Sequence, residues 1–303
     1  MKHTPACSEA TPRPAERLRH HAPAISPDRG GRPRKRRALA GCLVAAGWLA
    51  AFGSPALAQS DRPLTTEPAT TLAWGDIELE LGVESFRIPN PTGTRTRLWN
   101  APTLAAVAGI GPAADLRIEG AVLTWINPES GASAREPGDF TIWTKVRFWR
   151  GTPFQPVVGG RLGVKIPITS NESGLGTDET DFFAQVILTQ QVSRARLNLN
   201  LGLAILGDPQ RVAAQSDAIT YGLGCVVPVG GRLRIVGEVA GRQAPGSVFD
   251  RSFARLGARW QAAGVLWDAA LTAGFIDQSE DWGALAGVTL PFRWKPKEGI
   301  PIS

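Results

Sequence analysis

The sequence predicts an all-β protein, a closed antiparallel up-and-down transmembrane β-barrel of about 12 strands. From about residue 75 to residue 294, apolar residues recur at every second position, as in a strand whose successive side chains point to opposite faces. The predicted strands are about 9 to 14 residues long, enough to cross a bilayer when tilted. Short breaks alternate with long polar ones, which is typical of tight turns on one side of a membrane and longer loops on the other.

The N-terminal region predicts export. The basic stretch Arg32–Arg37 precedes the apolar run Ala38–Phe52 and the sequence Ala56-Leu57-Ala58, an order typical of a secretory signal peptide that is cleaved after Ala58. The alternative is a membrane anchor, but a helix needs about 20 apolar residues to span a bilayer. We therefore expect four segments: a disordered leader plus signal peptide (1–58), a periplasmic lead-in (59–71), an outer-membrane barrel (72–294) and a C-terminal tail (295–303).

Charge and residue types limit the function. Residues 1–58 hold 10 Lys/Arg and 3 Asp/Glu, whereas residues 59–303 hold 23 and 24, so the basic character belongs to the leader and no nucleic-acid partner is expected. All three histidines lie in the leader, and Cys225 is the single cysteine after it. This composition excludes an intramolecular disulfide, a Cys/His zinc site and a histidine-activated nucleophile in the exported chain. We therefore expect no enzyme, no catalytic residues, no cofactor and no metal.

The first six predicted strands each have an apolar and a polar face, apart from the second, which is weak and rich in alanine. In chain order they are Ile77, Leu79, Leu81 and Val83 against Glu78, Glu80 and Glu84 (75–87); the alanine-rich strand (98–110); Leu116, Ile118 and Val122 against Arg117 and Glu119 (114–126); Phe140, Ile142, Val146 and Phe148 against Lys145 and Arg147 (138–150); Val158, Leu162, Val164 and Ile166 against Arg161 and Lys165 (154–167); and Phe182, Val186 and Leu188 against Asp181 and Gln185 (180–192).

The last six strands repeat the pattern, most clearly in the seventh. They are Leu197, Leu199, Leu201, Leu203 and Ile205 against Arg196, Asn198 and Asn200 (195–206); Ile219, Leu223 and Val227 (217–228); Leu233, Ile235 and Val239 against Arg232, Arg234 and Glu238 (231–240); Leu256 and Trp260 against Arg255 and Arg259 (252–260); Trp267, Leu271 and Phe275 against Asp268 and Thr272 (265–275); and 282–294. The long loops are then 88–97, 127–137, 168–179, 207–216, 241–251 and 276–281. An even number of strands leaves both termini in the periplasm.

The apolar face could point inward or outward. In a soluble sandwich it packs inward, whereas in an outer-membrane barrel it faces lipid and the polar face lines the lumen. The signal peptide, the strand lengths and tryptophans near strand ends, such as Trp149, Trp260 and Trp282, favour the membrane. We therefore expect localisation in the outer membrane of a Gram-negative bacterium, with its lipids and the barrel assembly machinery as partners.

The polar faces predict which side chains line the lumen. The candidates are Lys145, Arg147, Arg161, Lys165, Arg196, Arg232 and Arg234, with Glu78, Glu80 and Glu119 as an acidic counterpart. Separated charges of this kind would orient polar solutes and weakly favour anions. Alternatively, the same side chains form a salt-bridge network that fills a narrow lumen, because buried charges are usually paired.

Three segments carry a resemblance to a known family: Gly138–Phe148 (GDFTIWTKVRF), Leu162–Thr169 (LGVKIPIT) and Leu175–Asp181 (LGTDETD). In this order and spacing they resemble the MetA-pathway phenol-degradation family of predicted outer-membrane, transporter-like proteins. The chain departs from that pattern at Asp178, where glycine is usual, and in the residues that follow Trp294, where an aromatic terminus is a common assembly signal.

The resemblance implies a barrel that passes or binds small molecules, aromatic or hydrophobic ones among them, and leaves the solute unidentified. The porin-like channel has two alternatives on the residues alone. The first is a structural barrel with a plugged lumen, and the second is a soluble periplasmic β-protein.

Overall fold

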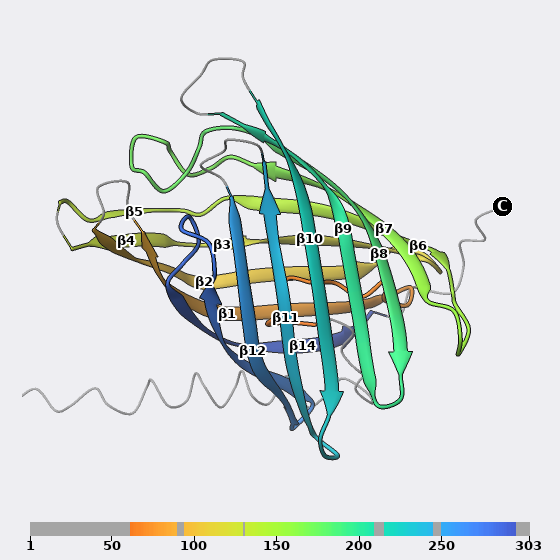
Figure 1. The fold of residues 1–303 in the computed structure, drawn as a ribbon. Coiled ribbons are helices and arrows are strands. Elements are labelled where there is room, and N and C mark those ends of the chain that lie inside the picture. The colour runs from red at the N-terminus through yellow and green to blue at the C-terminus, as the bar shows by residue number, and fades with distance from the viewer. Residues whose placement is uncertain (1–60, 90–93, 130, 209–214, 245–249, 295–303) are drawn as a thin grey trace, which may run out of the picture. The chain divides into compact units, whose positions relative to one another are not determined.

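The computed structural model describes residues 61–89, 94–129, 131–208, 215–244 and 250–294, and the predictions for the leader, the signal peptide and the tail lie outside these residues. Within the described ranges, no helix is both long and apolar enough to cross a bilayer. Fourteen antiparallel strands form one sheet (Figure 1). They are β1 (Asp76–Pro89), β2 (Arg95–Gly109), β3 (Ala114–Ala121), β4 (Thr124–Pro128), β5 (Ala134–Glu136), β6 (Phe140–Trp149), β7 (Val157–Ile166), β8 (Asp181–Val192), β9 (Ala195–Gly207), β10 (Gln215–Pro228), β11 (Leu233–Gln243), β12 (Arg251–Ala262), β13 (Val265–Gly274) and β14 (Trp282–Arg293).

The sheet closes on itself. The first strand, β1, pairs with β14 from Asp76 opposite Arg293 to Arg87 opposite Trp282, and it pairs with β2 on its other side. Closure satisfies the backbone groups that an open edge would expose, which a bilayer requires. An ion pair between Asp76 and Arg293, with Nε and Oδ1 2.6 Å apart, lies across the seam.

The predicted strand 114–126 is interrupted, and a short strand, β5, lies in the predicted loop 127–137. The long strand β2 pairs with β3 through residues 103–109 and with β4 through residues 96–100, so β3 and β4 are successive parts of one crossing, as are β5 and β6. The barrel therefore has twelve crossings, as predicted. The interruption faces Pro102, which cannot donate a ladder hydrogen bond, although its carbonyl oxygen still accepts the N–H of Val122 at 2.9 Å.

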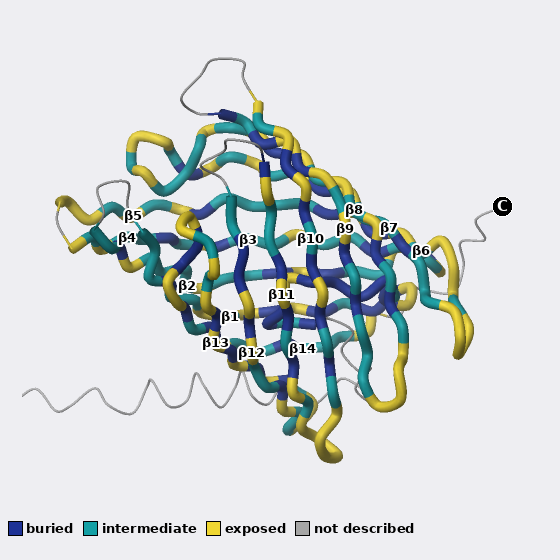
Figure 2. Tube along the Cα trace, in the orientation of Figure 1, coloured by how far each residue is buried: buried dark blue, intermediate teal, exposed yellow. Residues whose placement is uncertain are grey.

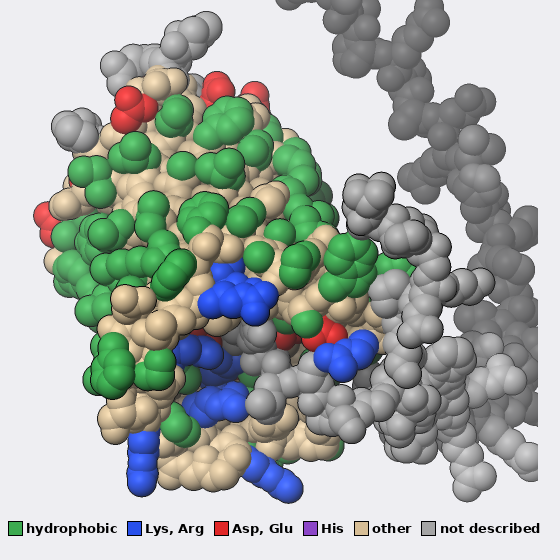
Figure 3. Space-filling model, turned by 90° about the vertical axis from the view of Figure 1, so that its right-hand side faces the viewer, with side chains coloured by type: hydrophobic (Ala, Val, Ile, Leu, Met, Phe, Trp, Pro, Cys, Tyr) green, Lys and Arg blue, Asp and Glu red, His purple; other side chains and the backbone are tan. Residues whose placement is uncertain are grey.

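The outer wall is apolar, as predicted for a membrane barrel. Leu203, Leu256 and Leu271 are 62 to 67 % exposed, whereas their neighbours Ala204, Arg255 and Thr272 are buried inside. Figure 2 shows buried and exposed positions alternating along the strands, and Figure 3 shows apolar side chains spread over the outer surface. So large an exposed apolar surface belongs in lipid rather than water, which excludes the dry interior of a soluble sandwich.

The two ends of the barrel differ. At one, the short-turn end, the strands are joined by tight connections, among them residues 193–194 and 263–264. At the other, the long-loop end, the connection 167–180 is the longest in the described part of the chain. Several strands run further towards this end than predicted, for example β11 to Gln243 and β12 from Arg251.

Candidate functional site

Residues 61–72, the inner segment, run inside the barrel. The predicted lead-in, 59–71, was expected in the periplasm, whereas the structure places its described residues, 61–71, against inward-facing side chains of the barrel. Backbone N–H groups of the inner segment donate hydrogen bonds to side chains of several strands. Leu72 donates to β3, Ala69 to β8, Glu67 to β9 and Thr65 to β11. The lead-in was predicted to lie in the periplasm because its residues are polar. Polar residues are equally suited to the polar lumen of a barrel.

The inner segment is held through its backbone by side chains of the wall. Glu238 on β11 accepts the N–H groups of Thr65 and Thr66 at 2.9 Å. The amide of Asn200 on β9 accepts the N–H of Glu67 at 2.7 Å and donates to its carbonyl oxygen at 2.9 Å. Backbone groups buried without partners would be costly, so the polar face of the barrel replaces the neighbouring strand that this segment lacks.

Charged contacts reinforce the backbone bonds. Asp61 is almost fully buried and pairs with Arg196 and, at 3.0 Å, with Arg259. Arg62 pairs with Asp268 on β13 at 3.1 Å. Buried charges need such partners, and the inner segment therefore supplies part of the charge balance of the lumen.

Glu67 lies at the centre of the inner segment and accepts from Lys145 at 3.3 Å. Burial alone would raise the pKa of Glu67, but Lys145, Arg117 and Arg161 outweigh burial and hold the pKa at about 2. The carboxylate is therefore charged at neutral pH.

Inward-facing glycines make room for the inner segment. A Cβ atom at Gly82 or Gly287 would overlap the guanidinium of Arg62, and a Cβ atom at Gly222 would lie 3.8 Å from the Cβ of Thr66. These glycines lie on the polar face of their strands, where the sequence gives no reason for a missing side chain. That irregularity is the signal from which an occupied lumen could have been predicted.

Most predicted lumen residues do face inward, and many are bound by the inner segment or by one another. Arg117 forms ion pairs with Glu80 at 2.8 Å and with Glu119 at 2.6 Å. Lys145 binds Glu67, and Arg196 binds Asp61. Much of the predicted charge separation is thereby neutralised, in the way that the salt-bridge alternative describes.

The remaining candidates have different positions. Arg161 stacks over the ring of Trp143, 4.3 Å from its centroid, and Glu78 is buried. Arg147 donates to the carbonyl oxygen of Pro112 at the short-turn end. Arg234 lies near that end, opposite Arg259. Arg232 does not line the lumen, because it precedes β11 in an exposed turn.

The residues behind the family resemblance meet around one loop. Lys165 binds Asp181 at 2.7 Å and donates to the hydroxyl of Thr177 at 2.9 Å. Asp139 accepts the N–H groups of Ile168 and Thr169 at 2.8 and 2.9 Å. These bonds hold the connection 167–180 against the long-loop ends of β6, β7 and β8, so Lys165 positions a loop rather than binding solute in the open lumen.

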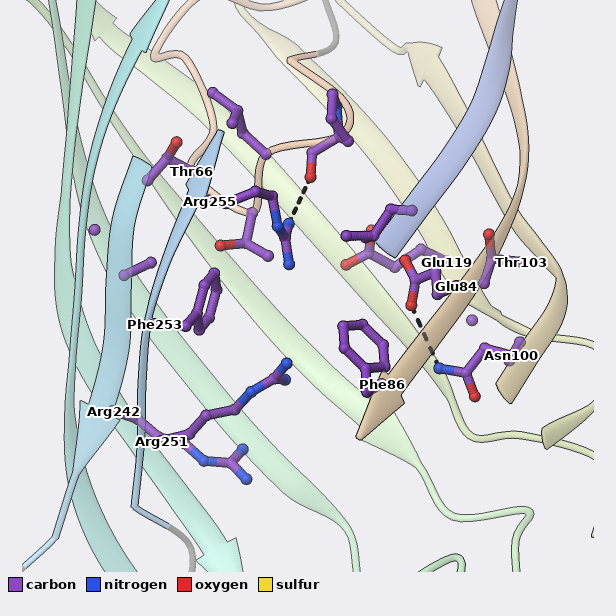
Figure 4. A pocket seen from close by; sticks show the side chains of 18 of the residues that line it. Thr66, Glu84, Phe86, Asn100, Thr103, Glu119, Arg242, Arg251, Phe253 and Arg255 are labelled. Atoms are coloured by element: carbon purple, nitrogen blue, oxygen red, sulfur yellow. Dashed lines mark hydrogen bonds between the residues drawn. The ribbon is translucent and has the colours of Figure 1, made fainter. Parts of the chain in front are cut away.

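The lumen contains a cavity of about 820 Å³ between the inner segment and the long-loop end. Residues from Arg62 to Glu67 line it on one side, and Pro89, Leu175 and Gln278 line it towards the loops. Arginines and carboxylates are equally numerous in its lining. Figure 4 shows Arg242, Arg251 and Arg255 reaching in from β11 and β12, with Glu84 and Asn100 on the opposite side.

The most distinctive cluster of the cavity combines arginine with phenylalanine. The guanidinium of Arg251 lies 5.0 Å from the ring centre of Phe253 and 5.5 Å from that of Phe86, and Arg255 lies 4.9 Å from Phe253. From the sequence, Arg242 and Arg251 are expected in the loop 241–251, and the cluster was missed because both strands continue further than predicted. In the described residues, no group of His, Cys, Asp and Glu is arranged to hold a metal.

Comparison with known proteins identifies the fold. No protein-family model matches the sequence, and no curated protein matches it. Among solved structures, the COG4313 outer membrane channel from Pseudomonas putida F1 is similar, with a TM-score of 0.57 and 12 % identity over 74 % of this chain and 98 % of that one. The translocator domain of the autotransporter NalP from Neisseria meningitidis has a TM-score of 0.50, with 12 % identity over 85 % of this chain and 95 % of that one.

The NanC porin also has a TM-score of 0.50, with 7 % identity over 71 % of this chain and 98 % of that one. At such low identity these likenesses concern the fold alone. Together with the closed sheet and its apolar exterior, they show that this chain has the fold of Gram-negative outer-membrane β-barrels.

Proposed function

We propose that the protein is a non-enzymatic outer-membrane channel for small solutes, belonging to the transporter-like group that its motifs resemble. The observation that carries the proposal is the cavity of about 820 Å³ inside a closed barrel with an apolar exterior. This volume is within the range of about 300 to 1,000 Å³ that is usual for small-molecule sites. The similar Pseudomonas structure is an outer membrane channel, which agrees with this role.

In this proposal the inner segment forms the constriction. Solute enters the cavity from the long-loop end and continues when the segment shifts against the wall. The segment is suited to movement because the bonds at Thr65, Thr66 and Glu67 go to side chains, which can rotate, rather than to a neighbouring strand. Displacing it does not require opening the β1–β14 seam.

The second candidate function is a structural barrel that stays plugged. The specific observation in its favour is the burial of the anchoring charges, since Asp61, Arg259 and Glu238 have side chains that are at most 1 % exposed. Removing such charges from their partners costs several kcal/mol. The two candidates differ in one measurable respect, which is whether ions pass the inner segment.

A disulfide lock distinguishes these candidates. Thr66→Cys with Gly222→Cys would bring two Cβ atoms to about the 3.8 Å that disulfides favour. Cys225→Ser removes the competing thiol of the exported chain. We expect stepwise currents in planar bilayers from the reduced protein, loss of current on oxidation and its return on reduction.

Each single-cysteine variant is the control, since neither can form the lock. A folded, heat-modifiable barrel that gives no current in either redox state would support the plugged barrel. Currents that are the same in the oxidised and reduced states would mean that solute passes without movement of the inner segment.

A further inference from the structure

We infer that the outer wall of the barrel carries a binding site for a phosphate-bearing lipid headgroup of the outer leaflet. The site, the arginine–tryptophan patch, consists of Arg97, Trp99, Trp125, Arg135 and Trp282. It lies at the long-loop end, where β4 and β5 extend the sheet beside β2 (Figure 1). The long loops of an outer-membrane barrel face the outside of the cell, so the patch adjoins the outer leaflet. The inference concerns the wall and does not depend on solute passage through the lumen.

The patch faces away from the lumen. On β2, Leu98 lines the cavity, so its neighbours Arg97 and Trp99 lie on the outer face of the strand. Trp125 is directly opposite Trp99, and Arg135 is directly opposite Trp125, so these residues share the outer face. The two tryptophans stack with their ring centres 5.9 Å apart. The patch is therefore a continuous surface across β2, β4 and β5.

The patch lies where the apolar part of the wall ends. On β1, Leu81 and Val83 are exposed on the outer face, and Arg87 follows on the same face towards the long-loop end. Arg87 is directly opposite Trp282 on one side and Arg97 on the other. Tryptophan and arginine side chains that follow an apolar wall are typical of the level of the lipid headgroups. We therefore place the patch beside headgroups rather than acyl chains.

Two arginines of the patch keep donors available for an anion. The guanidinium of Arg97 lies over the ring of Trp282, 5.6 Å from its centre, and contact with a ring face leaves N–H groups unused. Arg97 and Arg135 are exposed, and within the described residues neither side chain forms a hydrogen bond or an ion pair. Residues 90–93 of the adjoining loop contain no Asp or Glu. The planar fork of arginine matches two oxygen atoms of a phosphate.

The carboxylates beside the patch already have basic partners. Asp281 pairs with Arg95 at 2.6 Å and with Arg87 at 3.6 Å, and Glu129 pairs with Arg87 at 3.1 Å. These ion pairs join two acidic side chains with two basic ones, so they do not offset the charges of the two patch arginines. The surface is therefore suited to an anionic headgroup.

The tryptophans favour a lipid over a free anion. Trp282 is 44 % exposed, and the stacked Trp99 and Trp125 lie next to Arg135 on the same face. A headgroup phosphate can bind an arginine while the apolar part of the same lipid contacts these rings and the wall beside them. A free phosphate would gain the first contact alone.

Native mass spectrometry tests the inference on protein refolded in lipid-free detergent. The probes are diphosphoryl lipid A and the same lipid without its phosphates. We expect saturable binding of diphosphoryl lipid A and much weaker binding of the phosphate-free lipid. Arg97→Gln and Arg135→Gln should each weaken binding of diphosphoryl lipid A about fivefold, as expected for one basic residue at an anionic lipid surface. The double variant should weaken it about 25-fold, because separate sites usually add.

Two further variants keep the test specific. Arg150→Gln removes an exposed arginine at the short-turn end and should leave binding unchanged. Arg97→Lys keeps the charge but loses the planar fork, so its affinity should lie between those of the wild type and Arg97→Gln. Heat-modifiable migration confirms that each variant is folded.

Three outcomes would overturn the inference. Equal binding of the two lipids would mean that the phosphates are not recognised. Unchanged binding by the folded double variant, or equal weakening by Arg150→Gln, would mean that the patch is not the site. Displacement of lipid A by an equal concentration of inorganic phosphate would mean that the patch binds a free anion rather than a lipid.

Discussion

The two halves of the lumen have similar walls and different contents. Near the short-turn end the inner segment occupies the space, and its charges are paired with the wall, as in Asp61 with Arg259 and Arg62 with Asp268. Near the long-loop end the wall presents Arg242, Arg251 and Glu84 to a cavity. A polar inward face therefore does not by itself make a pore, because the same kind of face can bind a segment of its own chain.

The largest expected effect comes from removing the inner segment, which occupies the half of the lumen near the short-turn end. Deleting residues 61–72 should raise single-channel conductance several-fold, because the strands that close the barrel pair without this segment. Planar-bilayer recording measures the change, and heat-modifiable migration confirms the fold. A folded deletion variant with wild-type conductance would mean that the inner segment does not limit the pore.

The second prediction compares one carboxylate from each half. Glu238→Ala should destabilise the protein by about 3–5 kcal/mol, because it leaves Arg255 buried without its partner and removes the acceptor of Thr65 and Thr66. Glu84→Ala, in the cavity, should cost less than about 1 kcal/mol, since Glu84 accepts one long hydrogen bond from Asn100. Urea unfolding in detergent measures both. Equal losses would contradict the difference between the halves.

The third prediction concerns pH. Because the pKa of Glu67 is about 2 in the folded protein, below its ordinary value of 4.5, ionised Glu67 stabilises the docked inner segment. The contribution, on the order of 3 kcal/mol, is fully present above about pH 4.5 and is lost as the pH falls towards 2. Conductance should therefore rise over this range in the wild type. Glu67→Gln should lack that rise, and an identical acid response of the variant would rule out Glu67 as its source.

The smallest expected effect lies in the open half. Glu280→Gln should change stability by less than about 1 kcal/mol, because its partner Arg251 is partly exposed. Urea unfolding in detergent of this variant beside the wild type measures the change, and a loss as large as that of Glu238→Ala would contradict the expectation.

The sequence predicted the strands of the barrel wall far better than it predicted the inner segment and the cavity residues inside the barrel. Period-two rows such as Leu197 to Ile205 determine which side chains face lipid, and every crossing of the barrel was predicted, although the row is weak in the alanine-rich strand 98–110. The inner segment was missed because it has no periodicity of its own and binds through residues distant in sequence, such as Thr66 and Glu238. Arg242 and Arg251 were missed because turn-forming residues between them predicted a longer loop, whereas cross-strand pairing extends both strands.

The anchoring of the inner segment also has a consequence for barrel biogenesis. Its N–H groups are matched by Asp115, Thr189, Asn200 and Glu238, which come from four separate strands. Sliding any of these strands by one residue would turn its acceptor towards the lipid. The inner segment can therefore make all of these hydrogen bonds only when the strands of the barrel are paired in the correct register. Its binding thus depends on correct assembly of the barrel.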